Sequence, residues 1–299
     1  MKAAIFGSTG LLGTYLTAEL SARKWEVHGS NSAEGGRVDA TDAKAVSDFV
    51  LATKPDIVFN AIKTPLSTDQ CEVRQDEALA SNVTTAENIA RACSSAECRM
   101  VHFSSDWVYA GKKGVLYSET SPIAPLNFYA KTKAIAESRV RSFCPDALIL
   151  RVEGLFGIGA KGNDLFSRFL SAAKQGKPTE WSADQFAHPT FAGEAARMAA
   201  ELAAKGQTGT FNAVGRDYVS RHQLACAFCD EFDYPQSLAV PVSSAGRKIA
   251  IPLHLNLDVT KADSKAGTRL LSEQLATLHK QVKKNSNAGG APARGGIDG

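Results

Sequence analysis

The chain has 299 residues, of which 44% are hydrophobic and 22% charged, values that are ordinary for a folded globular protein. This composition excludes a disordered or collagen-like chain, and the length suffices for one large domain or two modest ones. The formal net charge of +3 is too small for the concentrated basic face that binds nucleic acid. No apolar run reaches the roughly 18 residues of a membrane span, and the apolar start breaks at Gly7, too early for a signal peptide. We therefore expect a cytoplasmic protein with no nucleic-acid and no membrane partner.

Short apolar strands alternate with amphipathic helices from the first residue. Strands are predicted at 2–6, 25–28, 57–59, 100–103 and 147–152, and helices at about 11–24, around 46–50 before Pro55, 72–96 and 129–141. This alternation predicts an α/β protein with a Rossmann-type, doubly wound parallel sheet that is covered by helices on both faces.

The alternation of strands and helices becomes less regular after residue 153, where helices are predicted near 165–174 and 193–205 and a strand near 211–214. We therefore divide the chain into a dinucleotide-binding domain (1–153) and a smaller, mixed α/β domain, mainly for substrate binding (154–283), some of whose segments return to the sheet. The remaining tail (284–299) is rich in glycine and has no aromatic residue, so we expect it to be disordered.

The six cysteines, at positions 71, 93, 98, 144, 226 and 229, show no regular framework. Only Cys226 and Cys229 form a CxxC pair, and no second pair of ligands follows at a spacing that suits zinc. We expect reduced thiols and no metal site.

A glycine-rich turn joins the first predicted strand to the first helix. Gly7 allows a tight turn, Gly10 lets the backbone approach a pyrophosphate, and Gly13 lets the helix pack closely on the sheet, with the phosphates at the positive helix N-terminus. This position after the first strand predicts dinucleotide binding. The remaining turn residues of the predicted cofactor site are Thr9, Leu11 and Leu12.

The tip of the second strand favours one dinucleotide over the other. NAD-selective sites usually carry a carboxylate there, whereas this chain has Ser30, Asn31 and Ser32. Hydroxyls and an amide accept a 2′-phosphate without charge repulsion, and Arg37 follows closely enough to pair with it, so NADP(H) is favoured and NAD(H) stays open. Asp39 either meets the adenine amine or caps the next helix.

Two YxxxK motifs compete for the role of catalytic acid. Tyr109 leads into a glycine-flanked turn that includes Lys113, whereas Tyr129 opens a run of good helix formers, which stacks it one turn from Lys133. An adjacent ammonium stabilises a phenolate and brings its pKa toward neutrality, so the second pair is the candidate acid.

Two serines follow the fourth predicted strand. Parallel α/β sheets bind ligands at the carboxyl ends of their strands, where Ser104 and Ser105 fall. A hydroxyl in that position can polarise a substrate carbonyl, or it can satisfy backbone groups at the strand end.

Four segments together, GSTGLLG (7–13), SSDWVYAG (104–111), PLNFYAKTK (125–133) and DQFAHPTFAG (184–193), resemble the extended short-chain dehydrogenases/reductases. Within this superfamily the chain is most similar to the dTDP-4-dehydrorhamnose reductase group, from residue 1 to about residue 283. The resemblance implies that Tyr129 is the catalytic acid/base, that Lys133 binds the nicotinamide ribose and lowers the tyrosine pKa, and that Ser105 occupies the catalytic Ser/Thr position. It places Asn60, Ala61 and Asn82 beside the cofactor. On the substrate side it places Lys63, Ser104, Asp106, Trp107, Gln185 and His188, although a structural role for His188 is equally open.

The resemblance also has departures. Related nucleotide-sugar dehydratases carry an Asp-Glu pair after the catalytic Ser/Thr, whereas this chain has Asp106-Trp107, which argues against dehydration; the loop 62–66 is unusual for the rhamnose-pathway enzymes. The implied activity is NAD(P)H-dependent reduction of a nucleotide-linked 4-keto-deoxysugar, and a homodimer is compatible with it. The alternatives are an NADP-binding regulatory subunit, like the β subunit of methionine adenosyltransferase, or a nucleotide-sugar epimerase.

Overall fold

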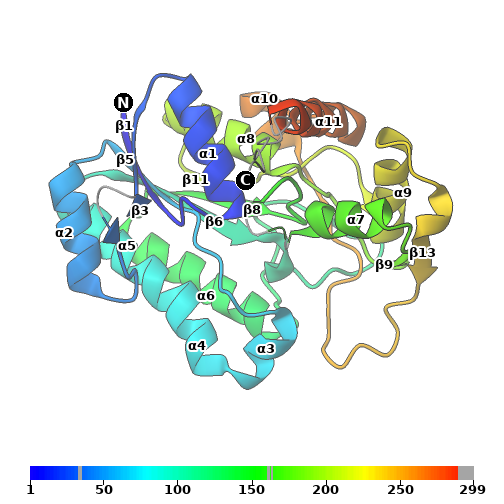
Figure 1. The fold of residues 1–299 in the computed structure, drawn as a ribbon. Helices are drawn as coiled ribbons and strands as arrows, with labels where there is room; N and C mark the ends of the chain where they lie inside the picture. Colours follow the sequence, from blue (N-terminus) through cyan, green and yellow to red (C-terminus); the bar gives the residue numbers. More distant parts are fainter. Residues whose placement is uncertain (33–35, 160–161, 163, 289–299) are drawn as a thin grey trace, which may run out of the picture.

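A six-stranded parallel sheet forms the centre of the computed structural model, which describes residues 1–32, 36–159, 162 and 164–288. Its strands run in the order β11-β8-β6-β5-β1-β2, and every neighbouring pair is parallel (Figure 1). Their bounds are β1 (Lys2–Phe6), β2 (Glu26–Gly29), β5 (Ile57–Asn60), β6 (Arg99–Ser105), β8 (Leu148–Val152) and β11 (Gly209–Asn212). The predicted fold class is confirmed.

Helices cover both faces of this sheet because successive strand residues point to opposite sides. In β1, Ala3 and Ile5 pack under α1 (Leu11–Ala22), α8 (Ala192–Ala204) and α10 (Thr260–Ala266). Ala4 and Phe6 pack against the other layer, formed by α2 (Ala43–Thr53), α5 (Thr85–Ser95) and α6 (Phe128–Phe143), which lies below the sheet in Figure 1.

The strand order reverses direction at β1, which lies between β2 and β5. The chain first crosses to one side of β1 and then continues on the other, so the turns that follow β1 and β5 diverge and leave a crevice at their carboxyl ends. Such a switch point is where open α/β sheets bind their ligands. The glycine-rich turn after β1 lies at this point.

The second region packs around aromatic side chains beside the sheet. It contains α7 (Leu165–Lys174), β9 (Thr179–Ser182), α9 (Arg221–Glu231), η3 (Gln236–Leu238), β13 (Ala239–Val242) and α11 (Leu271–Ala288) (Figure 1). Phe156, Phe166, Phe169 and Phe228 are buried together in its core. Short two-stranded ribbons complete it and border the site: β7 (Leu116–Tyr117), β10 (Phe186–Ala187), β12 (Val219–Ser220) and β14 (Asn256–Leu257). Although α8 and β11 come after residue 153, they belong to the sheet layers.

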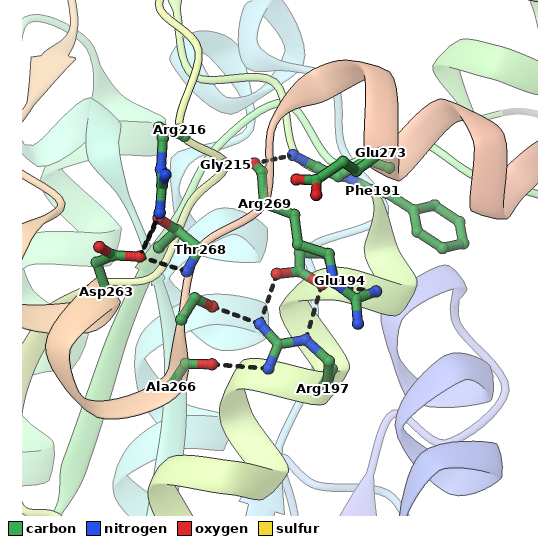
Figure 2. Close-up of polar contacts among 12 residues, drawn as sticks. Phe191, Glu194, Arg197, Gly215, Arg216, Asp263, Ala266, Thr268, Arg269 and Glu273 are labelled. Atoms are coloured by element: carbon green, nitrogen blue, oxygen red, sulfur yellow. Dashed lines mark hydrogen bonds and ion pairs between the residues drawn. The ribbon is translucent and has the colours of Figure 1, made fainter.

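Polar contacts hold the last part of the chain against α8 (Figure 2). Arg197 pairs with the buried Glu194 on its own helix at 2.6 Å and donates to the carbonyl of Ala266, the last residue of α10, at 2.7 Å. Beyond that helix, the amide of Thr268 donates to Asp263 at 2.8 Å. The chain therefore returns from the second region to the sheet layer before it enters α11.

Two predicted elements differ from the structure. The stretch 72–96 is not one helix: α3 (Thr68–Val73), α4 (Gln75–Leu79), a π-helical segment η1 (Ala80–Thr84) and α5 follow one another. The last helix, α11, continues to Ala288, so residues 284–288 are helical rather than disordered; the rest of the predicted tail lies outside the described residues. Of the helices described, none is long and apolar enough to cross a membrane.

Candidate active site

The glycine-rich turn leaves no room for a side chain at Gly7 or Gly13. Gly7 has a φ of +81°, and a Cβ at Gly13 would lie 2.1 Å from the Gly7 carbonyl oxygen. Gly10 is the N-cap of α1 and provides no side-chain cap for the amides of the first helical turn. The turn and the helix N-terminus therefore present free N–H groups and positive potential, which suit the pyrophosphate of a dinucleotide.

A short hairpin places Arg37 beside the tip of β2. β3 (Asn31–Ser32) and β4 (Gly36–Arg37) pair antiparallel with Asn31 opposite Arg37. The side-chain amide of Asn31 also donates to the Thr9 hydroxyl at 3.3 Å, which joins the tip of β2 to the glycine-rich turn. Ser30 is buried, and the side chain of Ser32 lies outside the described residues. The amide and the guanidinium together fit a 2′-phosphate.

Asp39 does not cap α2. The N-cap of that helix is Asp42, whose carboxylate accepts hydrogen bonds from the amides of Lys44 and Ala45. Asp39 is exposed and accepts from the Thr41 hydroxyl at 2.7 Å, and Thr41 holds the pKa of Asp39 below its usual range. The capping interpretation is wrong, and the contact of Asp39 with adenine stays a prediction.

Two hydrogen bonds fix the start of α6, the helix that carries Tyr129 in its first turn. The Asn127 side chain accepts from the amide of Ala130 at 2.9 Å, and the carboxylate of Glu72, on α3, accepts from the amide of Phe128 at 2.6 Å. Tyr129 follows in the first turn, and Lys133 is buried one turn later with its Nζ 2.7 Å from the carbonyl oxygen of Phe103. The helix thus presents both side chains toward β6.

The pKa values of this pair differ from the expectation. Burial raises the pKa of Tyr129 to about 12, against a hydrogen bond with Ser105 that lowers it. Burial lowers the pKa of Lys133 to about 8, and the nearby Glu137 opposes that shift. The Lys133 ammonium points to Phe103, so the predicted lowering of the tyrosine pKa by Lys133 is wrong for this structure. Tyr129 is consequently a protonated phenol near neutral pH, the form that a proton donor requires.

Ser105, Asp106 and Trp107 lie around the phenol. The Ser105 hydroxyl is 3.1 Å from Asp106 Oδ1 and accepts from the Trp107 amide at 3.2 Å, while the Trp107 ring meets the Tyr129 ring edge-on at 5.9 Å. Ser104 is buried at the end of β6. The structure therefore brings Ser105, and not only Lys133, to the candidate acid.

The residues predicted beside the cofactor lie at the same edge of the sheet. A Cβ on Gly7 would meet the Ala61 carbonyl oxygen at 2.8 Å, so these two turns touch. The side chain of Asn60 is already engaged with the ring of His102, at 3.2 Å, and with the amide of Ile62. Asn82 lies on the π-helical segment η1 and donates to Thr132 on α6 at 2.9 Å, which leaves its buried Oδ1 without a partner. Of the side chains of Asn60, Ala61 and Asn82, that of Asn82 is the one with a buried, unused acceptor.

The predicted substrate residues Lys63, Gln185 and His188 lie in three different environments. Lys63 is exposed on the loop after β5, and Gln185 is buried beside Arg221, whose amide donates to its carbonyl oxygen. His188 uses both ring nitrogens within the protein, since Nδ1 contacts the Gly215 carbonyl oxygen at 3.0 Å and Nε2 accepts from the amide of Leu257 at 3.1 Å. His188 therefore has the structural role.

The other YxxxK tyrosine is part of a buried polar network. The Tyr109 hydroxyl contacts Arg151 at 2.6 Å, the carbonyl oxygen of Ser118 at 2.9 Å and Asn212 at 3.1 Å. Arg151 in turn makes a double hydrogen bond with Glu137, at 2.9 and 2.8 Å. Glu137 was not among the predicted site residues, although its place four residues after Lys133 could have indicated it.

Glu153 and Arg221 were also not predicted. Glu153 directly follows β8 and is buried, with its Oε1 2.6 Å from Arg221 on α9. The rule that identified Ser104 and Ser105, a polar residue at the carboxyl end of a parallel strand, would also have selected Glu153. The ion pair connects the second region to the sheet at the site.

No metal cluster accompanies these groups. Among the described residues, no three His, Cys, Asp or Glu side chains are arranged to hold a metal ion, and the six cysteines are free thiols.

Comparisons with known proteins identify a family and several named relatives of the chain. Residues 1–284 match the model of the family described as "RmlD substrate binding domain". The chain is 31% identical to dTDP-4-dehydrorhamnose reductase of Aggregatibacter actinomycetemcomitans, over 76% of this chain and 78% of that protein. It is 28% identical to the "Probable low-salt glycan biosynthesis reductase Agl14" of Haloferax volcanii, over 93% and 97%. A crystal structure of a dTDP-4-dehydrorhamnose reductase from Clostridium acetobutylicum has a TM-score of 0.84 at 24% identity, covering 95% of this chain and 100% of that one. One from Bacillus anthracis, in complex with NADP, has the same TM-score at 22% identity, with 94% and 99% covered.

Similarity also extends to a protein of another class. The chain is 27% identical to the β subunit of methionine adenosyltransferase 2 of Pongo abelii, over 81% of this chain and 75% of that protein. The family match spans nearly the whole described chain, both the parallel sheet and the region beside it. The chain therefore belongs to the RmlD substrate-binding-domain family.

Proposed function

We propose that this protein is an NADPH-dependent reductase of a nucleotide-linked 4-keto-deoxysugar. One observation carries the proposal: Tyr129 on α6 lies against Ser105 at the carboxyl end of β6, and Lys133 follows one turn later on the same helix. The reductases named above share the family and give the substrate class.

Different residues of the chain bind the cofactor, bind the ketone oxygen and donate the proton in the proposed reduction. The chemistry that a bound NADPH supplies is hydride donation to the ketone carbon. The amides of the first turn of α1 bind the pyrophosphate, and Arg37 with Asn31 binds the 2′-phosphate. Ser105 donates a hydrogen bond to the ketone oxygen, and Tyr129 gives its proton to the alkoxide that develops there. Lys133 remains the candidate contact with the nicotinamide ribose.

The test is an NADPH-oxidation assay with a panel of dTDP-, UDP- and GDP-linked 4-keto-6-deoxy sugars. We expect turnover with at least one of them, and faster turnover with NADPH than with NADH. Tight NADP(H) binding without turnover on any member, together with a protein partner that co-purifies, would instead identify a regulatory subunit. Inversion of a sugar centre without net NADPH consumption would identify an epimerase.

The proposal also includes a homodimer and a cytoplasmic location. Light scattering on the purified protein measures the first, and fractionation of the cells that produce it measures the second. Neither is needed for the chemistry above, since every residue invoked there lies in one chain.

A further inference from the structure

Two buried carboxyl groups lie next to Ser105. Asp106 follows β6 directly and Glu153 follows β8 directly, and these strands pair with Ser105 opposite Val152. The two carboxyl groups therefore follow paired strand ends, and the charge of Glu153 acts directly on Asp106. Asp106 is 1% exposed and Glu153 is 2% exposed.

The hydrogen bonds of this pair are incomplete. Asp106 Oδ1 is 3.1 Å from the Ser105 hydroxyl, and Glu153 Oε1 accepts from Arg221 at 2.6 Å. The remaining oxygens, Asp106 Oδ2 and Glu153 Oε2, are buried without any partner. A carboxylate oxygen that is dry and unpaired is costly, whereas a neutral carboxylic acid is much less so.

The charges around Asp106 and Glu153 favour one bound proton on this pair of carboxyl groups. The charged and titratable groups that face it are Arg221 from α9 and, from α6, the neutral phenol of Tyr129. The Lys133 ammonium donates to the neutral Phe103 carbonyl oxygen and keeps its charge, but the charges that act most strongly on Asp106 are those of Glu153 and Arg221. Two carboxylates against one guanidinium would leave a net negative charge in a buried site, and one bound proton makes the group neutral.

Asp106 is the member that takes this proton. Arg221 bonds directly to Glu153 and so favours its ionised form, whereas Asp106 faces only the Ser105 hydroxyl and the Trp107 amide. Burial, and then the charge of Glu153, raise the pKa of Asp106 well above its usual range. The two causes act in the same direction.

We propose that Asp106 and Glu153 hold one proton, carried by Asp106, and that this proton makes Ser105 a hydrogen-bond donor to the substrate ketone. A serine hydroxyl has one hydrogen and two acceptor sites. In the structure the Ser105 hydroxyl accepts from the Trp107 amide and donates to Asp106 Oδ1. Once Asp106 carries the proton, its own hydroxyl donates to Ser105 in place of that bond, which leaves the Ser105 hydrogen for the ketone oxygen. An ionised Asp106 would instead take that hydrogen. Glu153 is then a positioning residue that acts through Asp106.

The kinetic test rests on the proposed reductase activity. In Glu153→Gln the charge that keeps Asp106 protonated is absent, so the alkaline decline of kcat should move to lower pH by about one unit or more, with activity recovered on acidification. Asp106→Asn cannot ionise, so that decline should disappear from its profile. Glu180→Gln, the same substitution at an exposed residue of β9, is the control and should keep the wild-type profile.

A second readout does not depend on turnover. Infrared spectra of the purified wild-type protein at mildly alkaline pH should contain the carbonyl band of a buried neutral carboxylic acid. The band should be absent in Asp106→Asn and weakened in Glu153→Gln at the same pH. A wild-type spectrum without the band, or a Glu153→Gln profile that superimposes on the wild type, overturns the inference. Lack of turnover on every sugar, with the band present, refutes the reductase function but not the shared proton.

Discussion

Replacing Lys133 by methionine should change how the stability of the cofactor-free protein depends on pH. Lys133 is 5% exposed, and burial lowers its pKa from 10.5 to about 8. Below the folded-state pKa the buried ammonium is charged in both states, so folding carries its full desolvation penalty. From the two pKa values, that penalty is about 3 kcal/mol at about pH 7 and about 1 kcal/mol at about pH 9.5.

The sign follows from proton binding. Between about pH 8 and the unfolded-state value, the unfolded chain binds more protons at this lysine than the folded protein does, so this contribution makes stability rise with pH. Methionine has a similar length and no titration. The variant should therefore lose about 2 kcal/mol of the rise that the wild type shows across this range. The variant also loses the hydrogen bond to Phe103, which lowers its stability at both pH values, so the comparison rests on the change of stability with pH and not on its absolute value.

The assay is urea unfolding of both proteins at the two pH values, without cofactor. Lys131→Met is the matched control, because Lys131 lies on the same helix and is exposed. The control should retain the wild-type pH dependence. If Lys133→Met also retains it, the ammonium is not desolvated in the folded protein, and the reasoning from burial is refuted.

Four other variants test the site. Tyr129→Phe should lower kcat by at least about 100-fold and spare cofactor binding. Tyr109→Phe should lower the free energy of unfolding by about 1–3 kcal/mol, because it removes a hydroxyl with three partners. The reverse pattern, in kinetics and denaturation, would exchange the roles of the two tyrosines. Arg37→Ala should raise the KM for NADPH about tenfold and leave that for NADH unchanged, as expected for one charged hydrogen bond; equal effects on both would remove the 2′-phosphate assignment. Gly13→Ala places a Cβ 2.1 Å from the Gly7 carbonyl oxygen, so NADPH binding measured by fluorescence titration should be lost, and unaltered binding would contradict the close packing.

The sequence predicts those parts of the fold and site that depend on local pattern. The strand at Lys2–Phe6 has the predicted bounds, because a buried apolar run that ends in a glycine-rich turn is a local signal. The choice of Tyr129 over Tyr109 also depends on local helix propensity, and the structure places Tyr109 in a buried network away from Lys133. The placement of Tyr129 beside Ser105 agrees with the predicted site, whose chemistry awaits the assays.

What could not be predicted depends on tertiary contacts. The π-helical turn at Ala80–Thr84 has no proline or glycine to announce it, and it places Asn82 against Thr132. The neighbourhood of Asp106 and Glu153 depends on the register between β6 and β8. The directions of the pKa shifts of Tyr129 and Lys133 follow from burial, which residue spacing does not give.

The α6 helix, which carries the candidate acid Tyr129, connects these findings. Tyr129, Lys133 and Glu137 follow one another at four-residue intervals and so share one face of α6. Glu137 is fixed by Arg151 of β8, at 2.8 Å, and its charge opposes the fall in the pKa of Lys133. The strand that anchors this face through Arg151 also ends at Glu153, the partner of Asp106. The two groups proposed to face the substrate ketone, the phenol on α6 and the hydroxyl of Ser105, therefore both depend on contacts with β8. A shift of β8 relative to the sheet would disturb both proton donors together, so this strand, which contains none of the three candidate catalytic residues, determines whether they can act.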